Sequence, residues 1–127
     1  MKKAEENLLE RYVAPVKDRF SFYAKYLEKA INEKIHIDKD FNLSFEDYGE
    51  YHSQKHLSFG QMAMCNLCIR LALIDNMFSG NLPFVILDDP FIGLDENNFN
   101  NMKKLIKEIS KDRQIIYFTC HDDRAIN

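Results

Sequence analysis

The sequence contains little glycine, proline or cysteine, and it has no long hydrophobic run. Its 127 residues include four glycines, three prolines and three cysteines. A membrane-spanning helix needs about 18 or more consecutive apolar residues, and no segment reaches that length. The first ten residues, MKKAEENLLE, lack the apolar core of a secretory signal peptide. We therefore expect no membrane segment and a cytoplasmic location.

An excess of positive charge is also missing, because 17 basic residues face 20 acidic ones and the net charge is -3. This balance excludes binding to nucleic acid or anionic membranes through overall charge, so any DNA contact must be local. An odd number of cysteines without a repeated spacing argues against a disulfide framework. Cys65 and Cys68 form a single C-x-x-C without a second ligand pair, so we expect core residues and no zinc site. Cys120 is expected to pack at the end of a strand.

The first quarter of the chain has the apolar spacing of a helix. Between residues 5 and 31, apolar residues recur at alternating steps of four and three: Leu9, Val13, Val16, Phe20, Tyr23, Leu27 and Ala30. This pattern is typical of a helix packed on the domain surface and equally of the root of a coiled-coil arm, and both interpretations remain open. Pro15 predicts a kink or a new helix start. We divide the chain into a helical arm, residues 1–34, and a lobe, residues 35–127.

The lobe has the pattern of an α/β domain. Residues 35–51 alternate between apolar and polar side chains, which indicates short antiparallel strands. Residues 61–78 are apolar on nearly every side, as in a buried helix. Residues 84–87 form a continuous apolar run, which predicts a central parallel strand covered on both faces. An amphipathic helix at about 96–111 and a second buried strand at 115–119 follow.

A strand, a helix and a strand in this order form a right-handed crossover unit, so both strands end at the same edge of the sheet. Asp88 and Asp89 follow the first strand, and His121 follows the second. Ligands of open α/β sheets bind outside this edge. The topology therefore predicts that the three side chains lie close together at a ligand site.

Four short segments stand in a fixed order: LSFGQ (57–61), VILDDP (85–90), GLD (93–95) and FTCHD (118–122). In that order they resemble the signature motif, Walker B strand, D-loop and switch histidine of the ABC-type ATPases. With the heptad helix before them, they look most like SMC-class and related recombinational-repair ATPases. The resemblance covers about residues 55 to 122. It implies the C-terminal half of an ABC-type P-loop NTPase head, with parallel strands, a crossover helix and a coiled-coil root.

The resemblance implies a role for each residue of the acidic pair and for the histidine. Asp88 would hold the Mg²⁺ that bridges the phosphates of ATP. Asp89 stands in the place of the catalytic base, where the family usually has glutamate, so the attacking water lies closer to the backbone or hydrolysis is slow. His121 matches the histidine that contacts the γ-phosphate. Because the two carboxylates share one field, we expect a raised pKa for Asp89.

The signature and D-loop residues have two readings each. Ser58, Gly60 and Gln61 stand at the start of a helix, whose positive end can donate to phosphate oxygens. The resemblance implies that this phosphate belongs to ATP held by a partner protomer, and that Gly60 allows the close approach. Ser58 is also an ordinary N-cap residue, with Gln61 beginning the helix. Asp95 matches the aspartate that communicates across the dimer, and it would equally cap the helix near residue 96.

The chain has no G-x-x-x-x-G-K-S/T sequence, whose backbone and lysine would hold the phosphates. We therefore expect that it neither binds ATP tightly nor hydrolyses it alone, and that it needs an N-terminal Walker A lobe from the same or a partner chain. The preferred prediction is one half of an ATPase site that works at a homodimer interface and drives DNA repair or chromosome-associated change. The alternative is a non-catalytic interaction module. A transporter domain ranks lower, because no Q-loop or helical subdomain is found.

Overall fold

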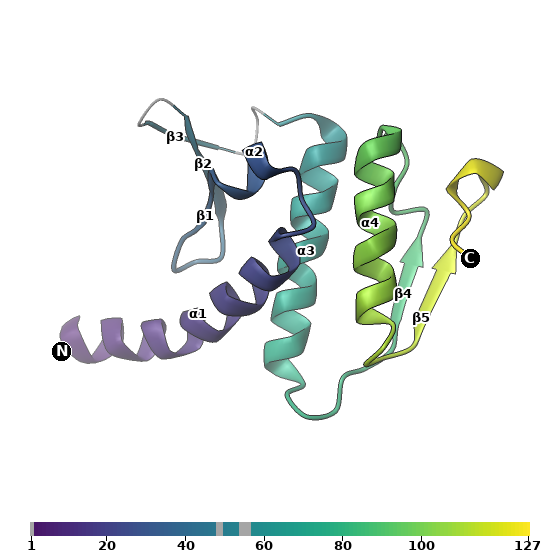
Figure 1. The fold of residues 1–127 in the computed structure, drawn as a ribbon. Coiled ribbons are helices and arrows are strands. Elements are labelled where there is room, and N and C mark those ends of the chain that lie inside the picture. Colours follow the sequence, from purple (N-terminus) through teal and green to yellow (C-terminus); the bar gives the residue numbers. More distant parts are fainter. Residues whose placement is uncertain (1, 48–49, 54–56) are drawn as a thin grey trace.

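The computed structural model describes residues 2–47, 50–53 and 57–127, and it confirms the predicted α/β class (Figure 1). None of its helices is long and apolar enough to cross a membrane. Strands β1 to β3 form an antiparallel sheet, and β4 pairs in parallel with β5. The elements are α1 (Lys2–Ala24), α2 (Lys29–Asn32), β1 (Ile35–Ile37), β2 (Leu43–Asp47), β3 (Glu50–Ser53), α3 (Phe59–Met77), β4 (Val85–Asp88), α4 (Glu96–Ile109), β5 (Ile115–Phe118) and a short 3-10 helix, η2 (Asp122–Arg124).

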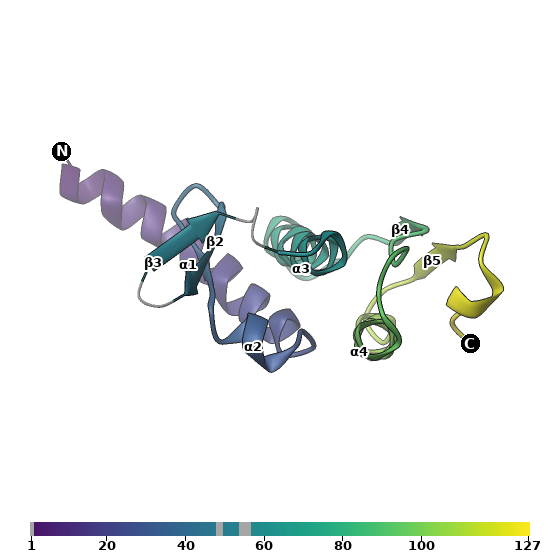
Figure 2. The same cartoon turned by 90° about the horizontal axis from the view of Figure 1, so that it is seen from above.

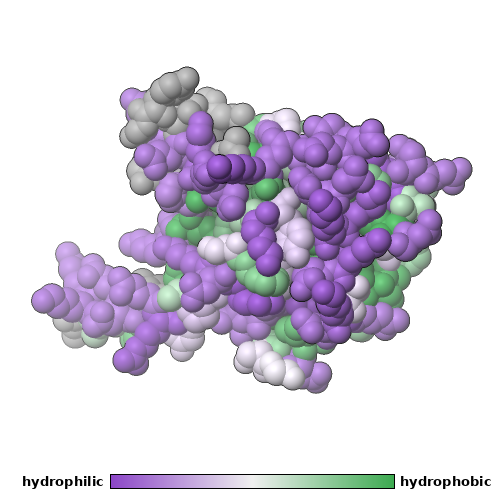
Figure 3. Space-filling model, viewed as in Figure 1, coloured by the Kyte–Doolittle hydropathy of each residue, from purple (hydrophilic) through white to green (hydrophobic). Residues whose placement is uncertain are grey.

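Helix α1 lies in two environments. Its second half packs on α3, and the predicted apolar positions Val13, Val16, Phe20 and Tyr23 are buried there. The earlier turns extend away from the lobe and are hydrophilic in Figure 3, although Tyr12 is an exposed aromatic side chain. The helix does not restart at Pro15, and its axis bends along its length (Figure 1). Leu9 in α1 and Ala30 in α2 were also predicted as apolar positions, and their side chains lie outside the described residues.

The antiparallel sheet forms as the alternating sequence predicts. Ile35 pairs with Phe45, and Ile37 pairs with Leu43. This register directs Ile37, Leu43 and Phe45 into the same buried cluster as α1 and α3. The sheet therefore closes the core beside the arm helix, far from the parallel strand pair (Figure 2).

Helix α3 lies between α1 and α4 in Figure 2. It is only partly buried, because Arg70, Asn76 and Met77 are exposed and several apolar positions are half-buried. The prediction of burial on nearly every side is therefore wrong for this chain. The core role predicted for Cys65 and Cys68 is confirmed, because both thiols are free and buried. Burial raises the pKa of Cys65 to about 12 and also raises the pKa of Cys68.

The parallel pair β4 and β5 is covered on one face by α4. The inward residues of α4 are buried as predicted: Phe99, Met102, Leu105, Ile106 and Ile109. On the other face, Ile86 and Phe118 are each more than half exposed, at 56% and 55%. The prediction that β4 is covered on both faces is wrong here, because Ile86 remains more than half exposed on this second face.

A buried carboxylate joins α1, α3 and the turn before β5. Asp75 of α3 is 7% exposed, and its carboxylate lies 2.7 Å from Arg19 Nη2 and 2.6 Å from Arg113 Nη2. The Tyr23 hydroxyl donates a hydrogen bond to the same carboxylate and accepts one from Arg113 at 3.2 Å. Burial, together with the hydrogen bond to Asp75, raises the pKa of Tyr23. Arg113 Nε and Nη1 are buried without a hydrogen-bond partner among the described residues, so Asp75 carries most of the compensation for this charge.

The first turn of α3 lies against the turn that follows β4. A Cβ atom on Gly60 would come within 2.8 Å of Leu94 Cδ2 and 3.3 Å of the Gly93 carbonyl oxygen. Gly93 itself has a φ of 80°, a backbone conformation that favours glycine. The absence of a side chain at Gly60 thus lets the segments 57–61 and 93–95 lie side by side within one chain.

We expect Asp75→Ala to reduce the free energy of unfolding by about 3–5 kcal/mol, because it leaves the Arg113 charge buried without a counter-charge. The measurement is urea unfolding of the chain followed by circular dichroism. Asn76→Ala, at an exposed neighbouring position of α3, is the control and should change stability by no more than about 0.5 kcal/mol. An Asp75→Ala chain as stable as this control would show that the buried network does not hold α1 in place.

We expect Gly60→Ala to destabilise the chain by roughly 1 kcal/mol. Overpacking typically costs about 1–3 kcal/mol, and the better helix propensity of alanine returns about 1 kcal/mol. The clash should prevail because Leu94 is buried and its Cδ2 has little room to move away, while the Gly93 carbonyl oxygen keeps the new methyl group from shifting to the other side. A double-mutant cycle with Leu94→Ala should show a combined loss smaller than the sum of the single losses. A Gly60→Ala chain more stable than the wild type would contradict the close approach.

Candidate functional site at the carboxyl edge of the parallel strands

The parallel register brings the two polar segments to one edge. Asp88, the last residue of β4, pairs with Phe118, the last residue of β5. The two strands run side by side in the same direction in Figure 1. Asp89 and residues 119–121 therefore leave the sheet next to each other, as the sequence predicts.

Asp89 is held by the end of β5. Its backbone N–H donates to the Phe118 carbonyl oxygen at 2.8 Å. Its carboxylate accepts hydrogen bonds from Thr119 Oγ1 at 2.8 Å and from Cys120 Sγ at 2.8 Å. Its φ of 45° is uncommon for a residue with a side chain. The Asp89 carboxylate is therefore fixed in place before any ligand binds.

The hydrogen bonds from Cys120 and Thr119 lower the pKa of Asp89. The expectation of a raised pKa is wrong, because these donors favour the charged carboxylate and outweigh the opposing effect of desolvation. The expected packing role of Cys120 is also wrong, because this side chain is exposed and its contact with Asp89 raises the pKa of its thiol. Both Thr119 and Cys120 stand within the FTCHD segment, but only the structure shows what they contact.

His121 is exposed at the same edge. Its backbone N–H donates to Thr119 Oγ1 at 3.2 Å, so this one hydroxyl contacts both Asp89 and His121. One ligand-type atom from each of Asp89, Cys120 and His121 lies within 4.8 Å of the others. The structure thus brings Asp89 and His121 together, as the crossover topology predicts.

Asp88 faces away from α4, on the open face of the sheet. It is exposed, and it borders a hollow of about 410 Å³ between α3 and β4. Phe59, Arg70 and Ile86 also line this hollow. Mg²⁺ prefers carboxylate oxygen and water ligands, so an exposed carboxylate at a strand end fits it as one protein ligand. Asp88 and Asp89, although adjacent, therefore lie in different surroundings.

The signature segment forms a regular helix cap. Gln61 donates its backbone N–H to Ser58 Oγ at 3.2 Å, and Ser58 donates its backbone N–H to Gln61 Oε1 at 3.0 Å. This reciprocal pair is a capping box. The capping interpretation of Ser58 is confirmed, and a phosphate contact there stays a prediction. Ser58 is exposed, whereas Gly60 is buried against Leu94, which gives glycine at position 60 a reason other than phosphate approach.

Asp95 caps α4. Its carboxylate accepts a hydrogen bond from the Asn98 backbone N–H at 2.7 Å. The turn before it is held by Arg124, which donates to the Leu94 carbonyl oxygen at 2.9 Å. Sequence reasoning did not identify Arg124, because no motif marks it. The cap role of Asp95 is established, and its role across a dimer stays a prediction.

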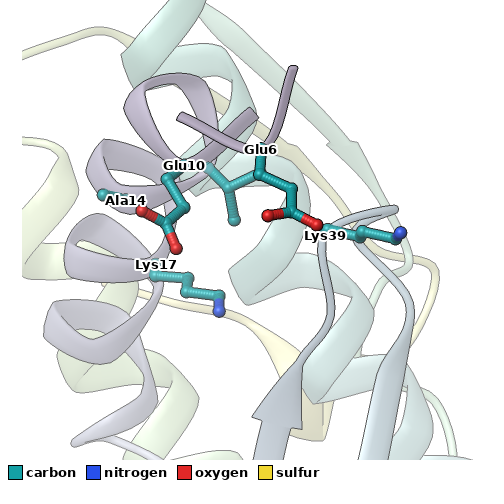
Figure 4. Close-up of a pocket in the computed structure, with 6 residues that line it drawn as sticks. Glu6, Glu10, Ala14, Lys17 and Lys39 are labelled. Carbon is teal, nitrogen blue, oxygen red and sulfur yellow. The ribbon is translucent and has the colours of Figure 1, made fainter. Parts of the chain in front are cut away.

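A second hollow, of about 400 Å³, lies between the first half of α1 and the loop after β1 (Figure 4). Charged side chains from Glu6, Glu10, Lys17 and Lys39 line it. None of the predicted site residues contributes to it. It therefore belongs to the arm and not to the edge of the parallel strands.

No protein-family model matches the chain. The DNA double-strand break repair Rad50 ATPase of Methanocaldococcus jannaschii is 26% identical over 103 residues, which cover 76% of this chain and 10% of that protein. The DNA repair protein RAD50 of Drosophila melanogaster is 30% identical over 87 residues, which cover 65% of this chain and 6% of that protein. The chain thus spans a tenth or less of the length of either relative.

Solved structures show the fold. A chain from a structural study of ATP-driven dimerization and DNA-stimulated activation of SMC ATPases matches with a TM-score of 0.67 and 22% identity. The match covers 91% of this chain and 73% of that chain. Its parallel strands, crossover helix and short antiparallel strands agree with an SMC head fold. The chain therefore has the fold of an SMC head, that is, of the C-terminal half of an ABC-type ATPase head, and it is similar in sequence to parts of two Rad50 proteins.

Proposed function

We propose that the chain supplies one half of an ATPase site and hydrolyses ATP only when an N-terminal Walker A lobe completes it. The observation that carries this proposal is the carboxyl edge of β4 and β5, where Asp88, Asp89 and His121 lie beside an uncovered sheet face. The motif residues supply acidic and imidazole groups there. The phosphate-binding loop would come from the other lobe.

The open sheet face supports the need for a second lobe. Parallel sheets are almost always covered on both faces, and a two-stranded sheet is marginal by itself. Here Phe84, Ile86 and Phe118 are each more than half exposed. Covering them with strands or a helix from a Walker A lobe would remove this apolar surface from water. That docking would also place the phosphate-binding loop next to Asp88.

In the completed site, the chain's own groups have separate tasks. Asp88 would hold Mg²⁺, which neutralises charge on the phosphates of ATP. Asp89, kept ionised by Thr119 and Cys120, would orient or activate the attacking water. His121 would contact the γ-phosphate. Ser58 and Gln61, at the exposed tip of α3, would face ATP bound by a second copy of the protein. Gly60 lets the signature and D-loop turns lie together, and Asp95 caps α4 and would take part in contacts across the dimer.

The relatives suggest what the completed assembly does. The matched SMC ATPases dimerize in an ATP-driven manner, and the Rad50 relative of Methanocaldococcus jannaschii is a DNA double-strand break repair ATPase. By analogy, this chain would form a homodimer across ATP that changes conformation in DNA repair or chromosome maintenance in the cytoplasm. Residues 1–34 would form the arm and residues 35–127 the lobe. The exposed first turns of α1 agree with an arm that continues beyond the lobe.

One observation favours the second candidate, a non-catalytic interaction module. The Asp89 side chain is one methylene shorter than the usual glutamate, and its carboxylate already accepts hydrogen bonds from Thr119 and Cys120. If those hydrogen bonds persist when nucleotide binds, Asp89 cannot reach the water. The site would then bind ATP, close the dimer and leave the nucleotide intact.

We expect ATP turnover to appear when the chain is mixed with its Walker A lobe. Asp89→Asn should lower turnover by about 10²- to 10⁴-fold, the usual contribution of a general base, while ATP binding persists. Asp88→Asn should in addition reduce the extent to which Mg²⁺ strengthens ATP binding. Phosphate release and binding of a fluorescent ATP analogue measure the two quantities. Asp112→Asn, at an exposed acid outside the cluster and outside the four motif segments, is the matched control and should behave as wild type.

Two other outcomes are informative. ATP binding on mixing without any turnover would replace the ATPase proposal with the interaction module. No interaction between the lobes, and no binding of ATP by the mixture, would overturn both.

A further inference from the structure

The Asp89, Cys120 and His121 cluster combines three different ligand chemistries. It offers a carboxylate oxygen, a thiol sulfur and an imidazole nitrogen, all within 4.8 Å of one another. Mg²⁺ takes oxygen ligands, whereas Zn²⁺ readily combines cysteine, histidine and carboxylate ligands. We propose that Asp89, Cys120 and His121 form a binding site for a thiophilic divalent cation of the Zn²⁺ type, separate from the Mg²⁺ position at Asp88.

The distances suit such a cation. Zn²⁺ bonds of about 2.0–2.3 Å place tetrahedral ligand atoms about 3–4 Å apart. Asp89 Oδ2 and Cys120 Sγ are already 2.8 Å apart, so they need only a small separation. Cys120 and His121 are exposed and adjacent in sequence, so side-chain rotation can bring the imidazole into range. Three protein ligands leave the fourth position to water.

Thr119 orients two of the proposed ligands, Asp89 and His121, through hydrogen bonds. Its Oγ1 contacts Asp89 Oδ1 at 2.8 Å and the His121 backbone N–H at 3.2 Å. This arrangement leaves Asp89 Oδ2, the oxygen that faces Cys120, available to a cation. Hydrogen bonds to a ligating carboxylate orient it and strengthen metal binding. Thr119 therefore plays the part of a supporting residue at a metal site.

Cation binding replaces one interaction and releases one proton. At present Cys120 donates its S–H to Asp89 Oδ2. When the metal–sulfur bond forms, the thiol proton passes to solvent and the thiolate and carboxylate both bind the cation. Cys65 and Cys68 do not compete, because they are buried in the core of α3.

The functional consequence rests on the proposed ATPase. A cation on Asp89 and His121 would occupy the two groups assigned to the attacking water and the γ-phosphate. Turnover would stop while Asp88 remained able to hold Mg²⁺. The site would thus act as a metal-dependent off state, with Cys120 as the residue that makes it selective for thiophilic cations.

The test uses Co²⁺, a spectroscopic substitute for Zn²⁺, and the 127-residue chain in excess Mg²⁺ with a phosphine reductant. We expect one Co²⁺ per chain with the near-ultraviolet absorption of a cobalt–thiolate bond, which Zn²⁺ abolishes by displacement. Cys120→Ser keeps a hydroxyl donor for Asp89 and should lose the band. His121→Asn should weaken Co²⁺ binding by more than the roughly 10- to 100-fold typical of losing a residue that only hydrogen-bonds to a metal ligand. Asp112→Asn, at an exposed acid outside the motif segments, should bind as the wild type does.

Circular dichroism confirms that each variant is folded. No thiolate band, a band that survives in Cys120→Ser, or a band that excess Mg²⁺ removes would each overturn the proposal. The outcome is independent of the proposed ATPase, because Co²⁺ binding is measured without nucleotide. In the mixed ATPase assay, inhibition by Zn²⁺ in wild type and its loss in Cys120→Ser would support the off state. Equal inhibition in both proteins would reject it.

Discussion

The parallel pairing of β4 with β5 is the constraint on which the site depends. Because Asp88 stands opposite Phe118, the residues after each strand must meet at one edge. Sliding the register by one residue would reverse the faces of a strand and send Asp88 toward α4 instead of toward the open face. The hydrogen bond from the Asp89 backbone to Phe118 extends the pairing by one residue beyond the strand. The same pairing therefore positions both carboxylates: Asp88 lies on the open face of the sheet, and Asp89 lies against the end of β5.

The strand pair is covered on only one of its two faces. α4 covers one sheet face with a continuous row of buried side chains, whereas Ile86 and Phe118 on the other face meet water. The hollow beside Asp88 lies on this uncovered side. A lobe that docks there would gain hydrophobic contact and reach the acidic edge in one step. The buried Asp75 network lies at the opposite end of α3 from the signature segment. It ties both the arm helix and the turn before β5 to α3.

Features that follow from periodicity could be predicted from the sequence. The inward face of α4, the antiparallel strands and the meeting of Asp89 with His121 depend on apolar spacing and crossover handedness, and both act locally. Burial of β4 on both faces was predicted wrongly, because an apolar run does not say which chain covers it. The lowered pKa of Asp89 could not be foreseen, since it depends on Thr119 and Cys120, about thirty positions away. The role of Gly60 was likewise hidden, because only the fold reveals that Leu94 lies against it.

The two adjacent aspartates show how one edge can carry two chemistries. Alternation along an extended strand turns Asp88 to the open face, beside the hollow between α3 and β4. The left-handed backbone at Asp89 breaks that alternation and directs its carboxylate to β5, where it meets a hydroxyl, a thiol and an imidazole. A hard cation suits the first position and a softer cation suits the second. The backbone conformation of one residue thus gives two adjacent carboxylates different surroundings.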